Sequence, residues 1–487
     1  VVVSAERAEG LSHRGERVIL VRPETSPEDV GGLHSAQGVL TARGGIVSHA
    51  AIVARGIGKP AVVGASEVGV DEARRLVTFG DRTVAEGEII SVNGTTGRVY
   101  LGALPVVNSP IKQKVAGQSI DAEGEDLHDR FLRLLGWASA AKAMQIRANA
   151  ETPKDLAVAL KLGAEGIGLA RTEHAVLEPA ERRIAFSALI LALSAEETAK
   201  ALAVLEPPME EEVYQIFRLL QGKPATIRLY DPVPNEFLPR SVDETGRVAD
   251  FLGVSPDEIR SRSASRAETN PMLGHRGVRL FVIDPAIAEM QVRATLRAAA
   301  RAKREGIAVR PEIQIPLVIN RTEIGLVADT IRRAAAVTLG ELGVEIPYEI
   351  GVMVETPAAV RTADEFAQDI QFFSLGVNDL SQTVLAVSRD DTARFIGQYE
   401  SLGILSGDPF RSIDRIVATF IAESVERAKR VNPSIFIFSA GDVGGDPPSV
   451  NLFHDIGLDG VSAGPWLVPL GILSAAQANI RRPRVRG

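Results

Sequence analysis

The chain of 487 residues contains no cysteine. Disulfide bonds, thiolate metal sites and thiol nucleophiles or acids are therefore excluded. The net charge is −8 and no long basic run occurs, so nothing favours binding to nucleic acid or to an anionic membrane surface. No apolar run reaches the length of a membrane span, and the first residues carry no signal segment. From these absences we expect a cytoplasmic protein without nucleic-acid or membrane partners.

The chain is too long for one ordinary core, which predicts two or three domains with room for a barrel of roughly 250 residues. Apolar residues make up 45% and charged residues 24%, an ordinary balance for a globular protein. The chain begins at Val1 without a methionine, in a pattern typical of the middle of a domain. We therefore expect a further segment upstream.

Residues 38–64 predict a strand, a glycine turn, a helix and a second short strand. The turn is Gly44-Gly45, and Ser48 is a good N-cap because its hydroxyl can accept a free N–H of the first helical turn. His49 follows at the first helical position, where unpaired N–H groups and the helix dipole favour an anion on the ring. We interpret His49 as a nucleophile that accepts a phosphoryl group. The alternative is a polar surface histidine, and the local pattern leaves both open.

The first 104 residues predict a small β/α domain of short strands, with a turn at Asn93-Gly94. Residues 105–140 are first polar and then helical in pattern, which predicts a hinge and a helix. From residue 141 to 487, strand-like runs alternate with amphipathic helices. Eight of these strands are predicted, at residues 145–151, 166–171, 225–231, 278–282, 312–318, 349–355, 372–379 and 435–442. Eight β/α units favour a (β/α)8 TIM barrel with insertions over the alternative, a doubly wound open sheet.

Polar side chains recur where the predicted strands end, and in a barrel these ends share one mouth. They are Arg171, Arg228, Glu355, Asn378 and Asp379. Arginines can bind phosphate and carboxylate groups bidentately, and Glu355 with Asp379 can hold one Mg²⁺. Together these groups predict a site that stabilises an enolate. Taken singly, each residue has the alternative of a solvated or ion-paired structural role.

The run GGIVSHAAIVARGIGKPAVVG (residues 44–64) resembles the phosphohistidine motif of the phosphoenolpyruvate (PEP)-utilising enzymes. Further blocks resemble pyruvate phosphate dikinases in the same order along the chain, among them GAEGIGLARTEH, NPMLGHRGVRL, GVMVETPAAV and FFSLGVNDLSQ. The resemblance implies a swivelling phosphohistidine domain at 1–104, a hinge and linker helix at 105–140, and a PEP/pyruvate-binding barrel at 141–487. It also implies a homodimer through the barrel, and a nucleotide-binding domain or partner that these residues lack.

The resemblance also implies roles for individual residues. His49 corresponds to the phosphohistidine, and Glu355 and Asp379 correspond to the Mg²⁺ ligands. The positions that correspond to substrate-binding residues are Arg171, Arg228, Arg276, Glu355, Gly376, Val377, Asn378, Asp379 and, by comparison with Enzyme I of the sugar phosphotransferase system, Arg389.

The pattern departs from the family at IFIFSAGDVGGDP, where the family has Cys-Gly-Glu-His-Gly-Gly-Asp-Pro. Alignment on Gly-Gly-Asp-Pro puts Ala440 at the cysteine, Asp442 at the glutamate and Val443 at the histidine. The family's cysteine protonates the enolate carbon, which Ala440 cannot do, and a positioned acid is typically worth ~10²–10⁴ in rate. Ser439 is adjacent, but side chains alternate along a strand, so its hydroxyl should point away. Val377 replaces a threonine of the dikinases.

We therefore predict a dikinase-type phosphotransferase that moves a phosphoryl group between a PEP-like substrate and His49 with Mg²⁺, and that lacks the usual acid for pyruvate formation. One alternative is a specialised biosynthetic relative that acts on a different enol or oxo acid, or diverts the enolate. Another is a catalytically impaired binding paralogue.

Overall fold

The computed structural model describes residues 1–25, 29–44, 50–51, 54, 58–106, 109–173, 180–389, 392 and 395–484. The chain divides into two compact units. The first contains Val1–Gly136 together with Leu385–Asp414, and the second contains Trp137–Val384 with Arg415–Gly487. The segment Leu385–Asp414 therefore interrupts the second unit in sequence and belongs to the first. The domain limits expected at residues 104 and 140 stay predictions.

In its described residues, the first unit is built on three small sheets. Its strands are β1 (Ile19–Arg22), β2 (Gly38–Thr41), β3 (Ala61–Val62), β4 (Val68–Asp71), β5 (Leu76–Phe79), β6 (Arg82–Ala85), β7 (Ile90–Asn93) and β8 (Arg98–Leu101). Strands β1, β2 and β3 are parallel, β4 to β6 form an antiparallel sheet, and β7 and β8 form a hairpin. The helices are α1 (Ala5–His13), α2 (Val30–Ser35), α4 (Pro110–Val115) and α18 (Ile396–Ser401), while α5 (Ala122–Ala141) runs from the first unit into the second.

The parallel sheet of the first unit is buried on both faces. Val21 and Leu40 pack into one apolar cluster with residues of the antiparallel sheet, such as Val77. Leu20 and Val39, which alternate with them along the strands, pack into a second cluster on the other face. This double burial explains why the strand sequence is continuously apolar rather than alternating.

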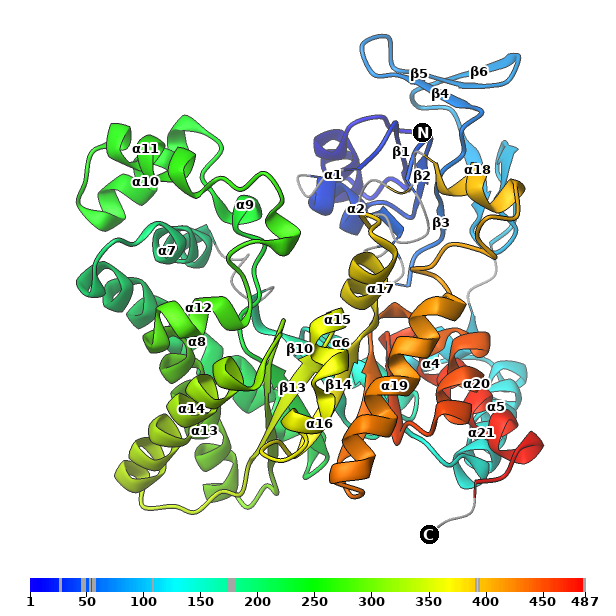
Figure 1. The fold of residues 1–487 in the computed structure, drawn as a ribbon. Coiled ribbons are helices and arrows are strands. Elements are labelled where there is room, and N and C mark those ends of the chain that lie inside the picture. The colour runs from blue at the N-terminus through cyan, green and yellow to red at the C-terminus, as the bar shows by residue number, and fades with distance from the viewer. Residues whose placement is uncertain are drawn as a thin grey trace. The chain divides into compact units, whose positions relative to one another are not determined.

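The second unit contains a closed barrel of eight parallel strands (Figure 1). They are β9 (Gln145–Asn149), β10 (Ile167–Arg171), β11 (Pro224–Arg228), β12 (Arg310–Ile315), β13 (Glu349–Val354), β14 (Phe372–Gly376), β15 (Phe436–Ala440) and β16 (Gly460–Ala463). Each strand pairs with its neighbour in sequence, and β16 closes the ring on β9. The predicted TIM barrel is confirmed, and the open sheet is excluded.

Helices and short 3₁₀ turns connect the barrel strands or follow the last of them. They are α6 (Pro153–Lys161), α7 (Ala180–Leu191), α8 (Ala195–Leu220), α9 (Pro234–Phe237), α10 (Val242–Leu252), α11 (Pro256–Arg266), η3 (Pro271–Leu273), α12 (Val278–Ile283), α13 (Pro285–Arg304), α14 (Arg321–Leu342), α15 (Pro357–Arg361), α16 (Ala363–Phe366), α17 (Val377–Leu385), α19 (Arg415–Val431), η5 (Asp442–Gly445), α20 (Pro447–Ile456), η6 (Pro465–Leu467) and α21 (Val468–Arg481). Several start at a proline behind a side-chain cap, as α6 does behind Thr152. Between β11 and β12, helices α9 to α13 form the longest insertion in the barrel.

The strand count was right, but one of the eight assigned strands was wrong and one strand of the barrel was missed. Residues 278–282, predicted as a strand, form helix α12, which buries Val278 and Phe281 three residues apart. A short apolar run fits either structure, and tertiary packing selects the helix here. Strand β16 was missed because Gly-Val-Ser-Ala has weak strand propensity, and only its pairing with β9 and β15 orders it.

The barrel interior holds a buried ion pair. The guanidinium of Arg147 on β9 donates to Glu312 on β12 through Nη1 at 2.5 Å and Nη2 at 3.2 Å, and both side chains are 1% exposed. Thr226 donates to the same carboxylate at 2.6 Å. The guanidinium also lies over the rings of Phe436 and Phe438, with centroid distances of 4.7 and 4.8 Å. Every charge here is compensated within the barrel wall.

Removing one partner should therefore leave an uncompensated buried charge. We expect Glu312→Leu to lower the free energy of unfolding by about 3–5 kcal/mol, measured by urea titration of the barrel transition. The double variant Arg147→Met/Glu312→Leu should recover most of this loss, since it removes both charges. Asp329→Asn, which removes an exposed partner of Arg332, is the control and should leave the midpoint nearly unchanged. A wild-type midpoint for Glu312→Leu would contradict this account.

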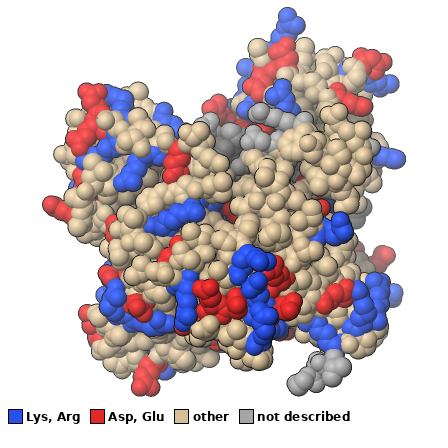
Figure 2. Space-filling model, in the orientation of Figure 1, with Lys and Arg blue, Asp and Glu red and all other residues tan. Residues whose placement is uncertain are grey.

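On the face shown in Figure 2, acidic and basic side chains are interspersed over the surface. None of the helices in the part of the chain that the structure describes combines the length and apolar character needed to cross a bilayer.

Candidate active site

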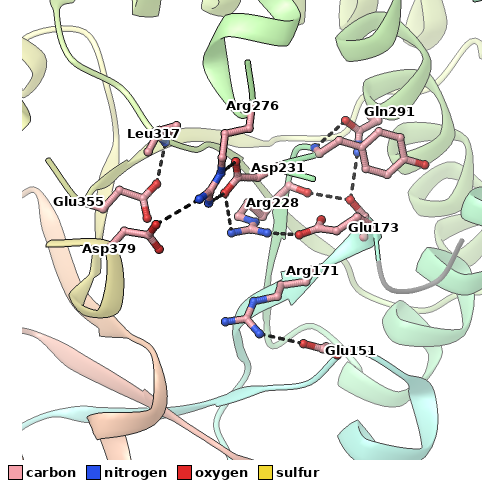
Figure 3. A network of polar contacts seen from close by, with 12 residues as sticks. Glu151, Arg171, Glu173, Arg228, Asp231, Arg276, Gln291, Leu317, Glu355 and Asp379 are labelled. Carbon is pink, nitrogen blue, oxygen red and sulfur yellow. Dashed lines mark hydrogen bonds and ion pairs between the residues drawn. The ribbon is translucent and has the colours of Figure 1, made fainter. Parts of the chain in front are cut away.

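Four charged residues of the predicted site lie at the carboxyl-terminal ends of barrel strands. Arg171 ends β10, Arg228 ends β11, Glu355 directly follows β13, and Asp379 lies in the first turn of α17, which follows β14. Because the strands are all parallel, these ends meet at one mouth of the barrel. Figure 3 shows the four side chains there together with Arg276, which comes from the turn before α12.

Asp231 lies at the centre of the polar network (Figure 3). Its two carboxylate oxygens accept hydrogen bonds from Arg276 Nε at 2.7 Å, Arg276 Nη2 at 2.5 Å and Arg228 Nη1 at 3.1 Å. Arg276 Nη1 donates to Asp379 Oδ1 at 3.3 Å, and Arg228 Nη2 donates to Glu173. A chain of alternating charges thus runs from Asp379 to Glu173.

Pairing keeps these buried groups charged. Burial favours the neutral form of Asp231, but the charges of Arg276 and Arg228 outweigh it and lower the pKa of this carboxyl. Burial likewise opposes the charge on Arg228, yet Glu173 and Asp231 raise the pKa of its guanidinium. The network therefore holds two permanently charged guanidiniums whose side chains are almost completely buried.

Glu355 is completely buried, and among the described residues only one of its two carboxylate oxygens accepts a hydrogen bond. Its Oε1 accepts the backbone N–H of Leu317 at 2.7 Å, and the φ of Leu317 is +56°, which is uncommon for a residue with a side chain. Its Oε2 has no hydrogen-bond partner among the described residues. Burial, and then the charges of Asp379 and Asp231, raise the pKa of Glu355 well above its ordinary value. Such a carboxyl is ready to take a further positive partner.

Gly376 makes the position of Glu355 possible. A β-carbon at residue 376 would lie 2.7 Å from the Cβ of Glu355 and 3.0 Å from the Cγ of Met353, and it would clash still more closely with Glu355 Oε2. Ordinary side chains do not tolerate such separations, so only glycine fits at this position while Glu355 keeps its place.

Arg171 differs from the other two arginines in its exposure. Its side chain is 29% exposed, against 7% for Arg228 and 5% for Arg276. Within the described residues, Arg171 Nη1 donates to Glu151 Oε1 at 3.2 Å. Because this pair is partly solvated, an incoming anion can compete for Arg171 at lower cost than for the buried arginines.

A buried amide fixes the backbone beneath the arginines. Gln291 on α13 accepts the N–H of Tyr230 at 2.9 Å and donates to the hydroxyl of Thr172 at 3.1 Å. Thr172 in turn donates to the carbonyl of Arg228 at 3.0 Å. The ends of β10 and β11 are thereby tied to one helix, which restricts where Arg171 and Arg228 can reach.

The comparison with protein families agrees with this geometry. A model described as the PEP-binding domain of PEP-utilising enzymes matches residues 126–480, most of the chain. The chain belongs to the PEP-utilising enzymes. A second model, the mobile domain of the same enzymes, matches residues 14–97.

Several pyruvate phosphate dikinases are similar to this PEP-utilising enzyme. Pyruvate, phosphate dikinase 1 of Arabidopsis thaliana is 43% identical over 480 residues, which is 98% of this chain and 48% of the relative. The dikinase of Rhizobium meliloti is 42% identical over 482 residues, covering 99% and 52%, and that of Clostridium symbiosum is 40% identical over 480 residues, covering 98% and 53%. The chain thus spans about half the length of the curated relatives it matches.

Ala440 gives this PEP-utilising enzyme an apolar wall at the end of β15. It is 1% exposed and clusters with Leu169 and Met353. The neighbouring Ser439 is also buried, and its hydroxyl has no partner among the described residues. Since strand residues alternate, this hydroxyl faces away from the side to which Ala440 points. No acid is contributed by either side chain at this place.

The remaining predicted residues are distributed differently. His49 falls outside the described residues, so its role stays a prediction. Arg389 lies in the segment Leu385–Asp414, which is part of the first unit. Val377 and Asn378 are buried at the start of α17, and Gly441, with φ +124°, passes close to Asn378.

Sequence reasoning missed the carboxylates that hold the arginines. Glu151 and Asp231 end the predicted strand segments 145–151 and 225–231, so their position was a usable signal. Glu173 follows Arg171 by two residues, and nothing local separates it from a solvated acid. Such counter-charges become visible only once the barrel places their partners.

The mouth can hold a divalent cation. Its labelled carboxylates, Glu151, Glu173, Asp231, Glu355 and Asp379, outnumber its three arginines (Figure 3). Within the part of the chain that the structure describes, Glu355 Oε2 has no hydrogen-bond partner, and Glu355 lies close enough to Asp379 for the two charges to interact. No set of three or more acidic or histidine side chains forms a complete cage within the described ranges. Two carboxylates with waters and substrate oxygens suit Mg²⁺, which rarely uses an all-protein cage.

The fit of Gly376 against Glu355 yields a test. We expect Gly376→Ala to displace the Glu355 carboxylate and to weaken divalent-cation binding about 10- to 100-fold, the usual effect of disturbing a ligand's support. Titration calorimetry with MgCl₂ and PEP measures this. The control is Gly340→Ala on α14, where an added β-carbon meets nothing within 4 Å. Unchanged cation affinity in Gly376→Ala would refute the role of this contact.

Proposed function

We propose that the chain is a dikinase-type phosphotransferase, which moves a phosphoryl group between a phosphoenol substrate and His49. The observation that supports this most is the network of Arg228, Asp231 and Arg276 beside the half-used carboxyl of Glu355. Two fixed guanidiniums and a cation-ready carboxyl suit a small ligand that carries both phosphate and carboxylate.

The arginines bind and orient the substrate in this proposal. Arg228 and Arg276 offer charge in a site that excludes water, where electrostatic attraction is strong. Arg171, which is more exposed, exchanges Glu151 for a substrate oxygen. The Asn378 amide, next to Gly441, supplies a neutral polar contact at the mouth.

The chemical step is a transfer at phosphorus. The imidazole nitrogen of His49 forms a bond to phosphorus while the bond from phosphorus to the enol oxygen breaks. The electron pair stays on that oxygen, so the substrate becomes an enolate, whose charge the arginines stabilise. A Mg²⁺ ion held by Glu355 and Asp379 would neutralise oxygen charge on the phosphoryl group and the enolate.

The fate of the enolate distinguishes this chain from the relatives it resembles. With Ala440 among Leu169 and Met353, the wall at β15 has no group to protonate carbon. We propose that phosphoryl transfer is retained, and that pyruvate forms slowly with water as the proton source. A second candidate, favoured by the same apolar wall, is a biosynthetic relative that accepts a different enol or oxo acid or diverts the enolate.

The proposal also includes a phosphoryl acceptor and an oligomeric assembly. The proposed phosphoryl acceptor after His49 is a nucleotide-binding domain or partner, and the proposed assembly is a homodimer through the barrel. The length of the relatives, about twice this chain, supports the first of these.

The phosphohistidine assignment is tested by the phosphoenzyme. With PEP and MgCl₂, we expect wild-type protein to give a phosphohistidine signal in ³¹P NMR and His49→Ala to give none. His13→Ala, which alters an exposed histidine at the end of α1, is the control and should label normally. The organic product is identified in the same tube. A phosphohistidine signal from His49→Ala after incubation with PEP would contradict the assignment of His49.

The missing acid is tested by restoring it. We expect Ala440→Cys to raise pyruvate formation by about 10²–10⁴-fold, with phosphoenzyme formation nearly unchanged, because the thiol acts only on the enolate. Ser439→Cys is the matched control, since its thiol would face away from the mouth. The proposal for Ala440 is wrong if pyruvate formation rises equally in both variants. It is also wrong if the wild type already makes pyruvate at the rate of Ala440→Cys.

A further inference from the structure

We propose that Asp231 is a positioning residue, which sets the spacing and orientation of Arg228 and Arg276 toward the substrate. This inference rests on the proposed function, because it assigns those two arginines to a phosphate- and carboxylate-bearing ligand. Asp231 itself would touch the guanidiniums and not the substrate.

The contacts of Asp231 are suited to this role. Arg276 presents its Nε and Nη2 edge to both carboxylate oxygens, at 2.7 and 2.5 Å, which is a bidentate pairing. Arg228 adds Nη1 to Oδ2 at 3.1 Å. The Asp231 side chain is 0% exposed, so water does not substitute for either partner.

No other carboxylate in the described network joins the two arginines. Glu173 pairs with Arg228, and Asp379 pairs with Arg276, each from a different side. Removal of Glu173 or Asp379 would take one partner from a single arginine, which Asp231 would still hold. Removal of Asp231 would uncouple the two arginines from each other and leave two like charges without the carboxylate between them.

The backbone around Asp231 leaves it little freedom. Gly277 has φ +59°, and a β-carbon there would lie 3.1 Å from Asp231 Oδ1 and 2.7 Å from the Cβ of Leu317. The turn that carries Arg276 therefore packs directly on the carboxylate. The N–H of Leu317 binds Glu355, so the same packing also connects the arginines to the proposed cation ligand.

Preorganisation is the physical benefit. An unrestrained arginine has many rotamers to lose when it binds a ligand, and a misplacement of about 1 Å at a reacting centre can cost about 10²-fold. Held by Asp231, both guanidiniums are ordered before the substrate arrives, so binding does not have to order them.

The test measures binding without turnover. In a His49→Ala background, titration calorimetry with PEP and MgCl₂ gives the parent Kd. We expect Asp231→Asn to raise the Kd about 10²-fold. We expect Asp231→Glu, which keeps the charge but moves it by one methylene, to raise the Kd at least tenfold. If Asp231 only balanced charge, Asp231→Glu would have the Kd of the parent, and that result would overturn the proposal. This comparison decides the question even if Asp231→Asn fails to fold.

The matched control is Glu206→Gln. Glu206 also bridges two arginines, accepting from Arg293 Nε at 2.7 Å and Arg297 Nη1 at 2.9 Å, but on helices α8 and α13. The Glu206→Gln variant should bind PEP with the same Kd as the parent. A rise equal to that of Asp231→Asn would mean that the effect is general destabilisation, and would overturn the positioning role.

A double-mutant cycle with Arg276→Lys separates positioning from simple loss of stability. If Asp231 acts through Arg276, this substitution should weaken binding much less in the Asp231→Asn background than in the parent. Strictly additive effects would overturn the proposal. Absence of PEP binding in the parent would overturn the proposed function and this role with it, whereas a parent-like Kd in Asp231→Asn would overturn this role alone.

Discussion

Compensation of buried charge is the constraint on which this barrel depends. A guanidinium or carboxylate can leave water only when an opposite charge lies within hydrogen-bonding distance. The barrel meets this condition twice. Inside the wall, Arg147 and Glu312 satisfy each other, with aromatic rings above the guanidinium. At the mouth, the network from Asp379 to Glu173 lies beside Glu355, whose Oε2 has no hydrogen-bond partner among the described residues. The first set is complete and structural, and the second is open to a ligand.

The mouth of the barrel has a charged part and an apolar part. Charged groups come from the ends of β10, β11, β13 and the first turn after β14, while the end of β15 contributes Ala440 with its apolar neighbours. A phosphorylated, carboxylated ligand would be bound by the first part, and its carbon chain would face the second. This division fits the proposed phosphoryl transfer without enzymatic protonation.

Local sequence and tertiary packing contributed unequally to what could be predicted. The alternation of strand-like runs with amphipathic helices was predictable because such signals act within a few residues, as the Thr152 cap and Pro153 do at the start of α6. The segment 278–282 was assigned wrongly because its apolar residues suit a strand or a helix, and packing of Val278 and Phe281 decides. The reverse holds for β16, whose small residues carry little preference and whose order comes from its two neighbours. These errors cancelled in the count of eight strands.

The sequence by itself determined the family, the barrel and the residue types that end its strands, because motifs and periodicity are local properties of the chain. It also determined that no thiol can serve as an acid. Only the tertiary structure decided which charges are paired. Arg228 and Asp231 lie three residues apart at the end of β11, but Arg276 comes from a turn 45 residues beyond Asp231. The space beside Glu355 exists because Gly376 lies on the adjacent strand. Ion pairs and close contacts depend on distances across the barrel, which no local pattern encodes.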